Sequence, residues 1–163
     1  TLCSRSRPAC DLCPLAESCA ARSAGTQADY PGKKSRKALP VKSTVMLLVR
    51  DPDGRVYLAR RPAEGIWGGL WSFPEVATEN DADPFCLDQF GVEPRAVEAW
   101  SPLRHTFSHY HLDIQPLLLS LPRSPGRIME GERGLWYNCA SPEQVGLAAP
   151  VARLLGMLEE RDP

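Results

Sequence analysis

The segment GIWGGLWSFPE, which runs from Gly65 to Glu75, carries the strongest signal for the fold of this 163-residue chain. It places three glycines beside two tryptophans, Trp67 and Trp71. Glycine permits close backbone approach and positive φ, so the pattern predicts a tight loop with large rings packed against bare backbone. Two interpretations stay open at this point: a corner of the hydrophobic core, or a stacking surface for a nucleic-acid base.

The residues around this segment predict a mixed domain that begins at Val41. Upstream, strands at Ser43–Arg50 and Val56–Arg60 are joined by Asp51-Pro52-Asp53-Gly54, a combination typical of a hairpin turn. Downstream, Asp83-Pro84 opens a helix that ends before Gly91. The other predicted elements are strands at Arg95–Trp100, Arg104–His109, Leu112–Ser120 and Gly134–Asn138, a short helix begun by Ser141-Pro142-Glu143, and a last helix from Pro150 with Val151, Leu154, Leu155 and Leu158 on one face. Strands and helices in this mixture indicate an α+β domain of about 120 residues.

Composition and charge limit the possible classes of protein. Hydrophobic residues make up 43% and charged residues 24%, which is enough apolar material for a folded core. The longest apolar runs, Val45–Val49 and Pro116–Leu119, are far shorter than the roughly 18 residues of a membrane span, and the first 19 residues lack the apolar centre of a signal peptide. Residues 1–40 carry seven Lys/Arg against three Asp/Glu (+4), and residues 41–163 carry twelve against seventeen (−5). The basic arm predicts either an anionic partner or a solvated linker.

Four of the six cysteines form a compact cluster with the spacing C-x6-C-x2-C-x5-C, at Cys3, Cys10, Cys13 and Cys19. Four thiolates in one short segment can surround a single soft metal centre. Disulfides are disfavoured because nothing indicates an oxidising compartment, whereas zinc and an iron–sulfur cluster both stay open. The two isolated cysteines, Cys86 and Cys139, are predicted to lie in the core.

This cysteine spacing, with the context CDLCPLAESC from Cys10 to Cys19, resembles the [4Fe–4S] loop of helix-hairpin-helix DNA glycosylases, in particular the MutY-type adenine DNA glycosylases. The resemblance implies that the four cysteines hold a [4Fe–4S] cluster and that the loop has a structural and DNA-contacting role. It makes Arg5 and Arg7 candidates for phosphate contacts, although two solvated arginines would look the same in the sequence.

The opening segment also resembles the Nudix box, GX5EX7REUXEEXGU, of nucleotide pyrophosphohydrolases. Gly69 and Glu75 match its beginning, and the second half aligns on Pro84–Val92 after a one-residue insertion. The two metal-binding glutamates are replaced by Asp88 and Gln89, which leaves too few carboxylates for Mg²⁺ at a diphosphate. The resemblance therefore implies a Nudix-like scaffold without hydrolase chemistry, as in the C-terminal domain of MutY-type glycosylases.

All three histidines lie within the segment Arg104–Leu112. On an unbroken strand His105, Phe107, His109 and His111 would share one face, unless a turn near Ser108 interrupts it. A metal site, a Ser/His hydrolytic pair and a simple hairpin with exposed polar residues are the alternatives. Phe107-Ser108-His109 matches the Phe-Ser-His motif of the MutY-type family, which implies that Ser108 reads 8-oxoguanine while Phe107 and His109 shape the loop or meet the DNA backbone.

Together these features predict three parts: an iron–sulfur loop at 1–22, an interdomain linker at 23–40 and a Nudix-like mixed-sheet domain with flanking helices at 41–163. The resemblance implies the C-terminal part of an adenine DNA glycosylase that recognises 8-oxoguanine opposite adenine in double-stranded DNA. No catalytic domain is found in the sequence, so we expect the chain alone to be inactive, monomeric, and disordered and free of iron over residues 1–40. The expected location is the bacterial cytoplasm, at the nucleoid. The alternatives are a Nudix hydrolase of oxidised nucleotides and a zinc-bearing adaptor module.

Overall fold

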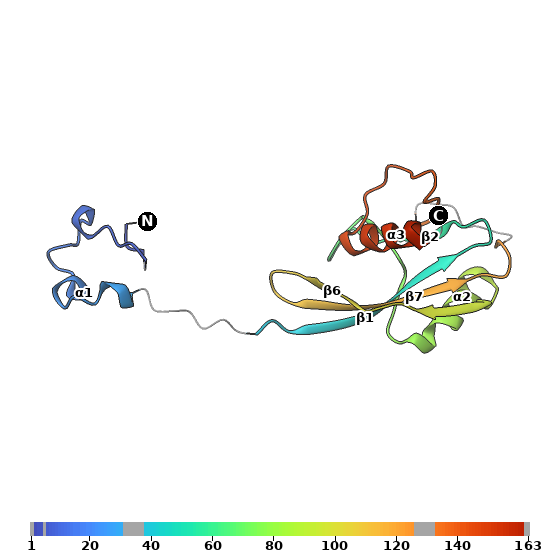
Figure 1. Cartoon of the computed structure of the whole chain (residues 1–163), viewed down its shortest axis with the longest axis horizontal. Coiled ribbons are helices and arrows are strands. Elements are labelled where there is room, and N and C mark those ends of the chain that lie inside the picture. The colour runs from blue at the N-terminus through green and yellow to red at the C-terminus, as the bar shows by residue number, and fades with distance from the viewer. Residues whose placement is uncertain (1, 5, 31–37, 126–132, 162–163) are drawn as a thin grey trace. The chain divides into compact units, whose positions relative to one another are not determined.

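The computed structural model describes residues 2–4, 6–30, 38–125 and 133–161. The chain divides into two compact units, Thr1–Ala38 and Leu39–Pro163 (Figure 1). The division falls close to the start of the domain expected at residue 41, and each unit is described below by itself.

The N-terminal unit is built from short helical turns rather than from long elements. It contains the 3-10 helix η1 (Cys10–Leu12), the α-helix α1 (Ala20–Ser23) and the 3-10 helix η2 (Gln27–Asp29). The Thr26 amide donates to the carbonyl of Ala21 at 2.9 Å, which ties η2 to the end of α1. Helical turns therefore continue through Asp29, where the sequence predicted an extended linker from residue 23, whereas the disorder expected over residues 1–40 stays a prediction. The rest of that linker, 31–37, lies outside the described residues.

The second unit is organised around one mixed sheet. Its strands are β1 (Val41–Arg50), β2 (Val56–Arg60), β3 (Trp71–Ser72), β4 (Glu75–Val76), β5 (Ala96–Ala99), β6 (Leu103–Thr106), β7 (His111–Ser120) and β8 (Gly134–Tyr137). The long central strands β1 and β7 pair in parallel over their full lengths, and the other pairings are antiparallel. The path β3-β2-β1-β7-β5 gives the sheet its centre, with β4, β6 and β8 attached to β1, β7 and β2. The predicted α+β fold with a mixed sheet is confirmed.

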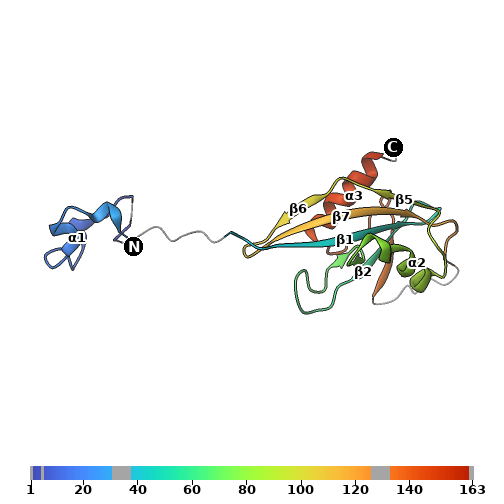
Figure 2. The same cartoon turned by 90° about the horizontal axis from the view of Figure 1, so that it is seen from below.

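Alternating residues of β1 supply two hydrophobic cores, one on each face of the sheet. Met46 and Leu48 pack in the cluster that contains the buried face of α3 (Ala149–Arg161). Val45, Leu47 and Val49 pack in a second cluster with Ala82 and Cys86 of α2 (Ala82–Phe90). Figures 1 and 2 show the two helices on opposite faces of the sheet. Burial on both faces explains the unbroken apolar run in β1.

A local signal determines the C-terminal end of α2, whereas a distant pairing overrides one predicted helix. Gly91 ends α2 in the left-handed conformation (φ 66°), as its position predicts. The helix expected from Ser141 is absent from the structure, because the following residues extend alongside β3. The Trp71 amide donates to the carbonyl of Gly146 at 2.8 Å, and the Ala148 amide donates to the carbonyl of Trp71 at 3.1 Å.

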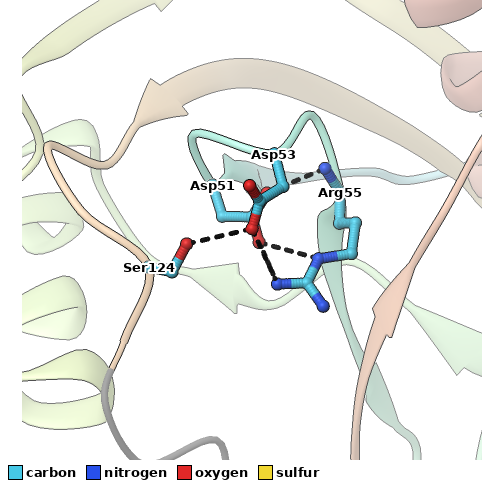
Figure 3. Close-up of polar contacts among 4 residues, drawn as sticks. All are labelled: Asp51, Asp53, Arg55 and Ser124. Carbon is cyan, nitrogen blue, oxygen red and sulfur yellow. Dashed lines mark hydrogen bonds and ion pairs between the residues drawn. The ribbon is translucent and has the colours of Figure 1, made fainter.

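The β1–β2 hairpin forms at the predicted turn and contains a buried carboxylate (Figure 3). Asp51 is only 4% exposed; its carboxylate accepts hydrogen bonds from the Arg55 backbone amide and Nε, both at 2.9 Å. Asp53 accepts from Arg55 at 3.3 Å and from the hydroxyl of Ser124, in the loop after β7, at 3.2 Å. The turn is therefore linked by side chains to a distant loop.

We expect Arg55→Leu to lower the free energy of unfolding by about 1–3 kcal/mol, because Asp51 loses its charged partner while still buried. Chemical denaturation measures the change. Arg104→Leu is the matched control: Arg104 donates to Asp113 at 2.6 and 2.8 Å and holds the pKa of that carboxyl below its usual value, but both side chains are solvent-exposed. An equal loss in both variants would contradict the role assigned to burial.

Among the described residues, no helix has the length and apolar character needed to cross a membrane.

Candidate nucleic-acid interface

The predicted Phe-Ser-His segment forms the turn between β6 and β7. The Phe107 amide donates to the carbonyl of Tyr110 at 2.9 Å, which closes the turn and interrupts the strand, as one of the sequence alternatives required. Ser108 and His109 are exposed, and the Ser108 hydroxyl lies 3.3 Å from His109 Nδ1. The turn thus presents a hydroxyl and an imidazole to solvent.

An aromatic cluster packs against this turn. We use this name for the rings of Trp67, His105, Phe107, His109 and Tyr110. Phe107 stands at its centre, with ring centroids 4.6 Å from His105, 4.6 Å from Tyr110, 5.1 Å from Trp67 and 6.3 Å from His109. Tyr110 is 4% exposed; burial raises the pKa of its phenol, and the Lys42 ammonium lies 4.9 Å from its ring centre. The exposed Ser108 therefore lies on a turn whose neighbouring aromatic side chains pack against one another.

The segment Gly65–Glu75 contributes Trp67 to the aromatic cluster. The Arg61 guanidinium lies 5.7 Å from the Trp67 ring centre, donates from Nε to the carbonyl of Ile66 at 3.0 Å, and forms an ion pair with Glu75. Phe73 and Ser72 are buried, whereas Trp67 is only half-buried. The segment is thus part of the core at Ser72 and Phe73. At Trp67 it leaves part of an aromatic ring accessible to solvent.

The residues that align with the Nudix metal ligands are not arranged to bind a cation. Asp88 and Gln89 are exposed on α2, where the Gln89 amide donates to Asp88 at 3.0 Å. Glu75 is occupied by Arg61. Within the described ranges, no group of three or more His, Cys, Asp or Glu side chains is arranged to hold a metal ion. The chemistry of the donor set agrees, since an amide replaces one of the carboxylates that Mg²⁺ prefers.

The four clustered cysteines line one small cavity of about 50 Å³ in the N-terminal unit. Leu2, Pro8, Ala9 and Tyr30 also line it, so the surroundings of the thiols are largely apolar. All four are free thiols; Cys3 is exposed and the others are half-buried. Four soft donors directed at one apolar cavity fit an iron–sulfur cluster by donor type, although the thiols are not closed around a common point. Arg7 is exposed, and Arg5 lies outside the described residues.

The structure contains a basic cleft that the sequence did not predict. Arg60, Arg61 and Arg133 line a cleft of about 320 Å³, together with Gly69 and the turn at Pro62. The Arg60 amide donates to the carbonyl of Arg133 at 3.0 Å, and Arg60 Nε donates to the carbonyl of Gly69 at 3.2 Å. The pair Arg60-Arg61 was visible in the sequence, but Arg133 joins it only because β8 pairs with β2.

Comparison with known proteins places the chain in a family. The Nudix-domain family model matches residues 45–157, and the chain belongs to this family. Along nearly its whole length it is similar to adenine DNA glycosylases. It is 28% identical to the Buchnera aphidicola (subsp. Acyrthosiphon pisum) enzyme over 95% of this chain, and 34% identical to the Arabidopsis thaliana enzyme over 51% of it. The chain spans 44% of the Buchnera protein's length and 15% of the Arabidopsis protein's.

Solved structures support the same fold. The C-terminal domain of mouse MUTYH, determined in complex with human PCNA, superposes with a TM-score of 0.59 at 20% identity and covers 74% of this chain and 89% of that one. A MutT protein from Methanosarcina mazei Go1 gives a TM-score of 0.56 at 12% identity, with 78% and 99% coverage. The resemblance to the C-terminal part of adenine DNA glycosylases, inferred from the cysteines and the Phe-Ser-His segment, is confirmed.

Proposed function

We propose that this chain is the lesion-recognition part of an adenine DNA glycosylase and that Ser108 contacts 8-oxoguanine opposite adenine in double-stranded DNA. The observation that carries the proposal is the exposed Ser108 hydroxyl on a turn held by the aromatic cluster. In 8-oxoguanine N7 carries a hydrogen and C8 an oxygen, whereas guanine N7 is a bare acceptor. A serine hydroxyl can accept from N7–H and donate to O8, so it distinguishes the two bases.

Binding to matched duplexes tests this proposal. The chain is titrated at low salt with duplexes that contain a central 8-oxoguanine·adenine or guanine·adenine pair. We expect tighter binding to the oxidised duplex. Equal binding to both would contradict the proposal for this chain, and absent binding would mean that recognition requires the rest of a longer protein. Excision of adenine by the chain alone would contradict the expectation that it is inactive without a catalytic domain.

The basic cleft is proposed to contact the DNA backbone. The domain after residue 40 is acidic overall. Arg60 and Arg133 in one cleft, beside an Arg61 that is paired with Glu75, are therefore a local excess of positive charge that suits a phosphate. We expect Arg60→Ala and Arg133→Ala to weaken binding to both duplexes equally, and each lost phosphate contact to reduce the slope of log K against log[salt] by about 0.9. Arg153→Ala, exposed on α3, is the control. A change in lesion preference without a change in salt slope would contradict a backbone role.

We also propose that Cys3, Cys10, Cys13 and Cys19 hold a [4Fe–4S] cluster in the parent enzyme. Their shared cavity supports the proposal. Without iron, we expect these thiols to be alkylated at pH 8, whereas Cys86 stays unmodified because burial raises its pKa to about 12. Anaerobic addition of iron and sulfide is expected to protect all four together, which peptide mass mapping detects. Protection by zinc alone would favour the adaptor alternative.

The alternative function, hydrolysis of oxidised nucleotides, is less well supported because Glu75 is paired with Arg61 and Gln89 cannot replace a carboxylate ligand. A pyrophosphate-release assay with Mg²⁺ tests it. The parent enzyme is proposed to act as a monomer in the bacterial cytoplasm, at the nucleoid.

A further inference from the structure

Trp67 has a backbone conformation that its side chain does not favour. Among the described non-glycine residues, it alone has a positive φ, 56°. The left-handed region is costly for a bulky residue, and such outliers persist only where the surroundings hold them. The neighbouring Gly65 and Gly69 also have positive φ, which needs no explanation for glycine. A tryptophan in this conformation therefore indicates that its side chain has a specific role.

Close contacts on both sides hold this conformation. Gly68 follows Trp67, and a Cβ there would lie 2.2 Å from the carbonyl oxygen of Ala63, so the loop closes tightly against its own backbone. The carbonyl of Trp67 accepts from the Leu70 amide at 3.0 Å. Beside the ring, Arg61 is fixed by the Ile66 carbonyl and by Glu75. Glu75, which aligns with the first Nudix glutamate, thus acts here through Arg61.

The ring that this loop holds in place faces the β6–β7 turn. Its centroid lies 5.1 Å from Phe107 and 5.3 Å from His105, and Phe107 directly precedes Ser108. We propose that Trp67 is a positioning residue: its left-handed backbone turns the indole toward Phe107, and this contact fixes the Phe107–His109 turn for its meeting with DNA. The DNA part of this inference rests on the proposed function, whereas the contact between the two loops does not. Tight support of a contacting group is what precise recognition requires.

Two substitutions distinguish the effect of the Trp67 ring from the effect of its backbone conformation. Trp67→Gly removes the ring but keeps a residue that accepts φ 56° without strain, so the loop can retain its path. Trp67→Phe keeps an aromatic ring for Phe107 and His105 and tests rescue. Trp71→Phe, in β3 and outside the aromatic cluster, is the matched control for loss of an indole. Thermal unfolding of each variant verifies that the domain is folded.

Two readouts are then measured on the whole chain. The amide NMR signals of Phe107, Ser108 and His109 report the turn without DNA, and the ratio of affinities for the 8-oxoguanine·adenine and guanine·adenine duplexes reports recognition. We expect Trp67→Gly to shift or broaden these signals and to reduce the ratio about tenfold, with most of both effects reversed in Trp67→Phe.

The inference is overturned if a folded Trp67→Gly variant leaves the turn signals unchanged, or if Trp71→Phe has the same effect on them. It is also overturned if the signals move while the affinity ratio is kept. When the unsubstituted chain shows no preference, the proposed function has failed, and the NMR signals alone decide whether Trp67 positions the turn.

Discussion

Replacement of Ser108 by alanine is expected to reduce the preference for the 8-oxoguanine·adenine duplex by about 5- to 150-fold, which corresponds to about 1–3 kcal/mol. The hydroxyl is the group that can accept from N7–H and donate to O8, and alanine offers neither function. The change should leave the fold intact, because Ser108 is exposed and its hydroxyl approaches only the neighbouring His109, at 3.3 Å, among the interactions described for it. The effect is therefore expected in binding and not in stability.

Competition titrations with the two duplexes measure this preference directly. Ser101→Ala, an exposed serine between β5 and β6, is the matched control for loss of a hydroxyl. A Ser108→Ala variant that weakens both duplexes to the same degree would show that Ser108 contacts the backbone instead of the lesion. A variant with unchanged preference would remove Ser108 from the site and leave Phe107 and His109 as the residues to examine.

The parts of the fold that the sequence predicted are those set by neighbouring residues. Asp51-Pro52-Asp53-Gly54 forms the expected hairpin turn, and Gly91 ends α2 as expected. The parallel pairing of β1 with β7 was not predicted, because it joins strands far apart in the chain. The same reason explains the incorrect helix at Ser141: its cap and proline are good local signals, but pairing with Trp71 extends the residues that follow.

The candidate site was predicted in a similar, partial way. Resemblance identified Phe107, Ser108 and His109, whereas the chemistry of these residues alone left a metal site and a hydrolytic pair open. The sequence predicts Trp67 in a tight loop, but the contact of Trp67 with Phe107 depends on two loops that meet only in the folded domain. The arginine cleft depends in the same way on the β2–β8 pairing.

Because the loop around Trp67 links the core to the site and closes tightly at Gly68, this glycine should be sensitive to added bulk. We expect Gly68→Ala to lower the free energy of unfolding by about 1–3 kcal/mol, since its Cβ would lie 2.2 Å from the Ala63 carbonyl oxygen and 2.9 Å from the carbonyl carbon, backbone atoms that cannot rotate away. Movement of this backbone should also displace Trp67 and weaken the lesion preference.

Substitutions at two further glycines distinguish steric overlap from backbone strain as the cause of a loss of stability. Gly69→Ala meets no atom within 4 Å but requires φ 73°, so its expected cost of about 1–2 kcal/mol comes from backbone strain alone. Gly156→Ala lies in α3 with open space and no such strain, and should stabilise the domain by about 0.5–1 kcal/mol. Thermal and chemical unfolding of the three variants tests this order. If Gly68→Ala proved as harmless as Gly156→Ala, the tight closure at Ala63 would be wrong, and with it the reason why a tryptophan can be held at φ 56° beside the Phe107 turn.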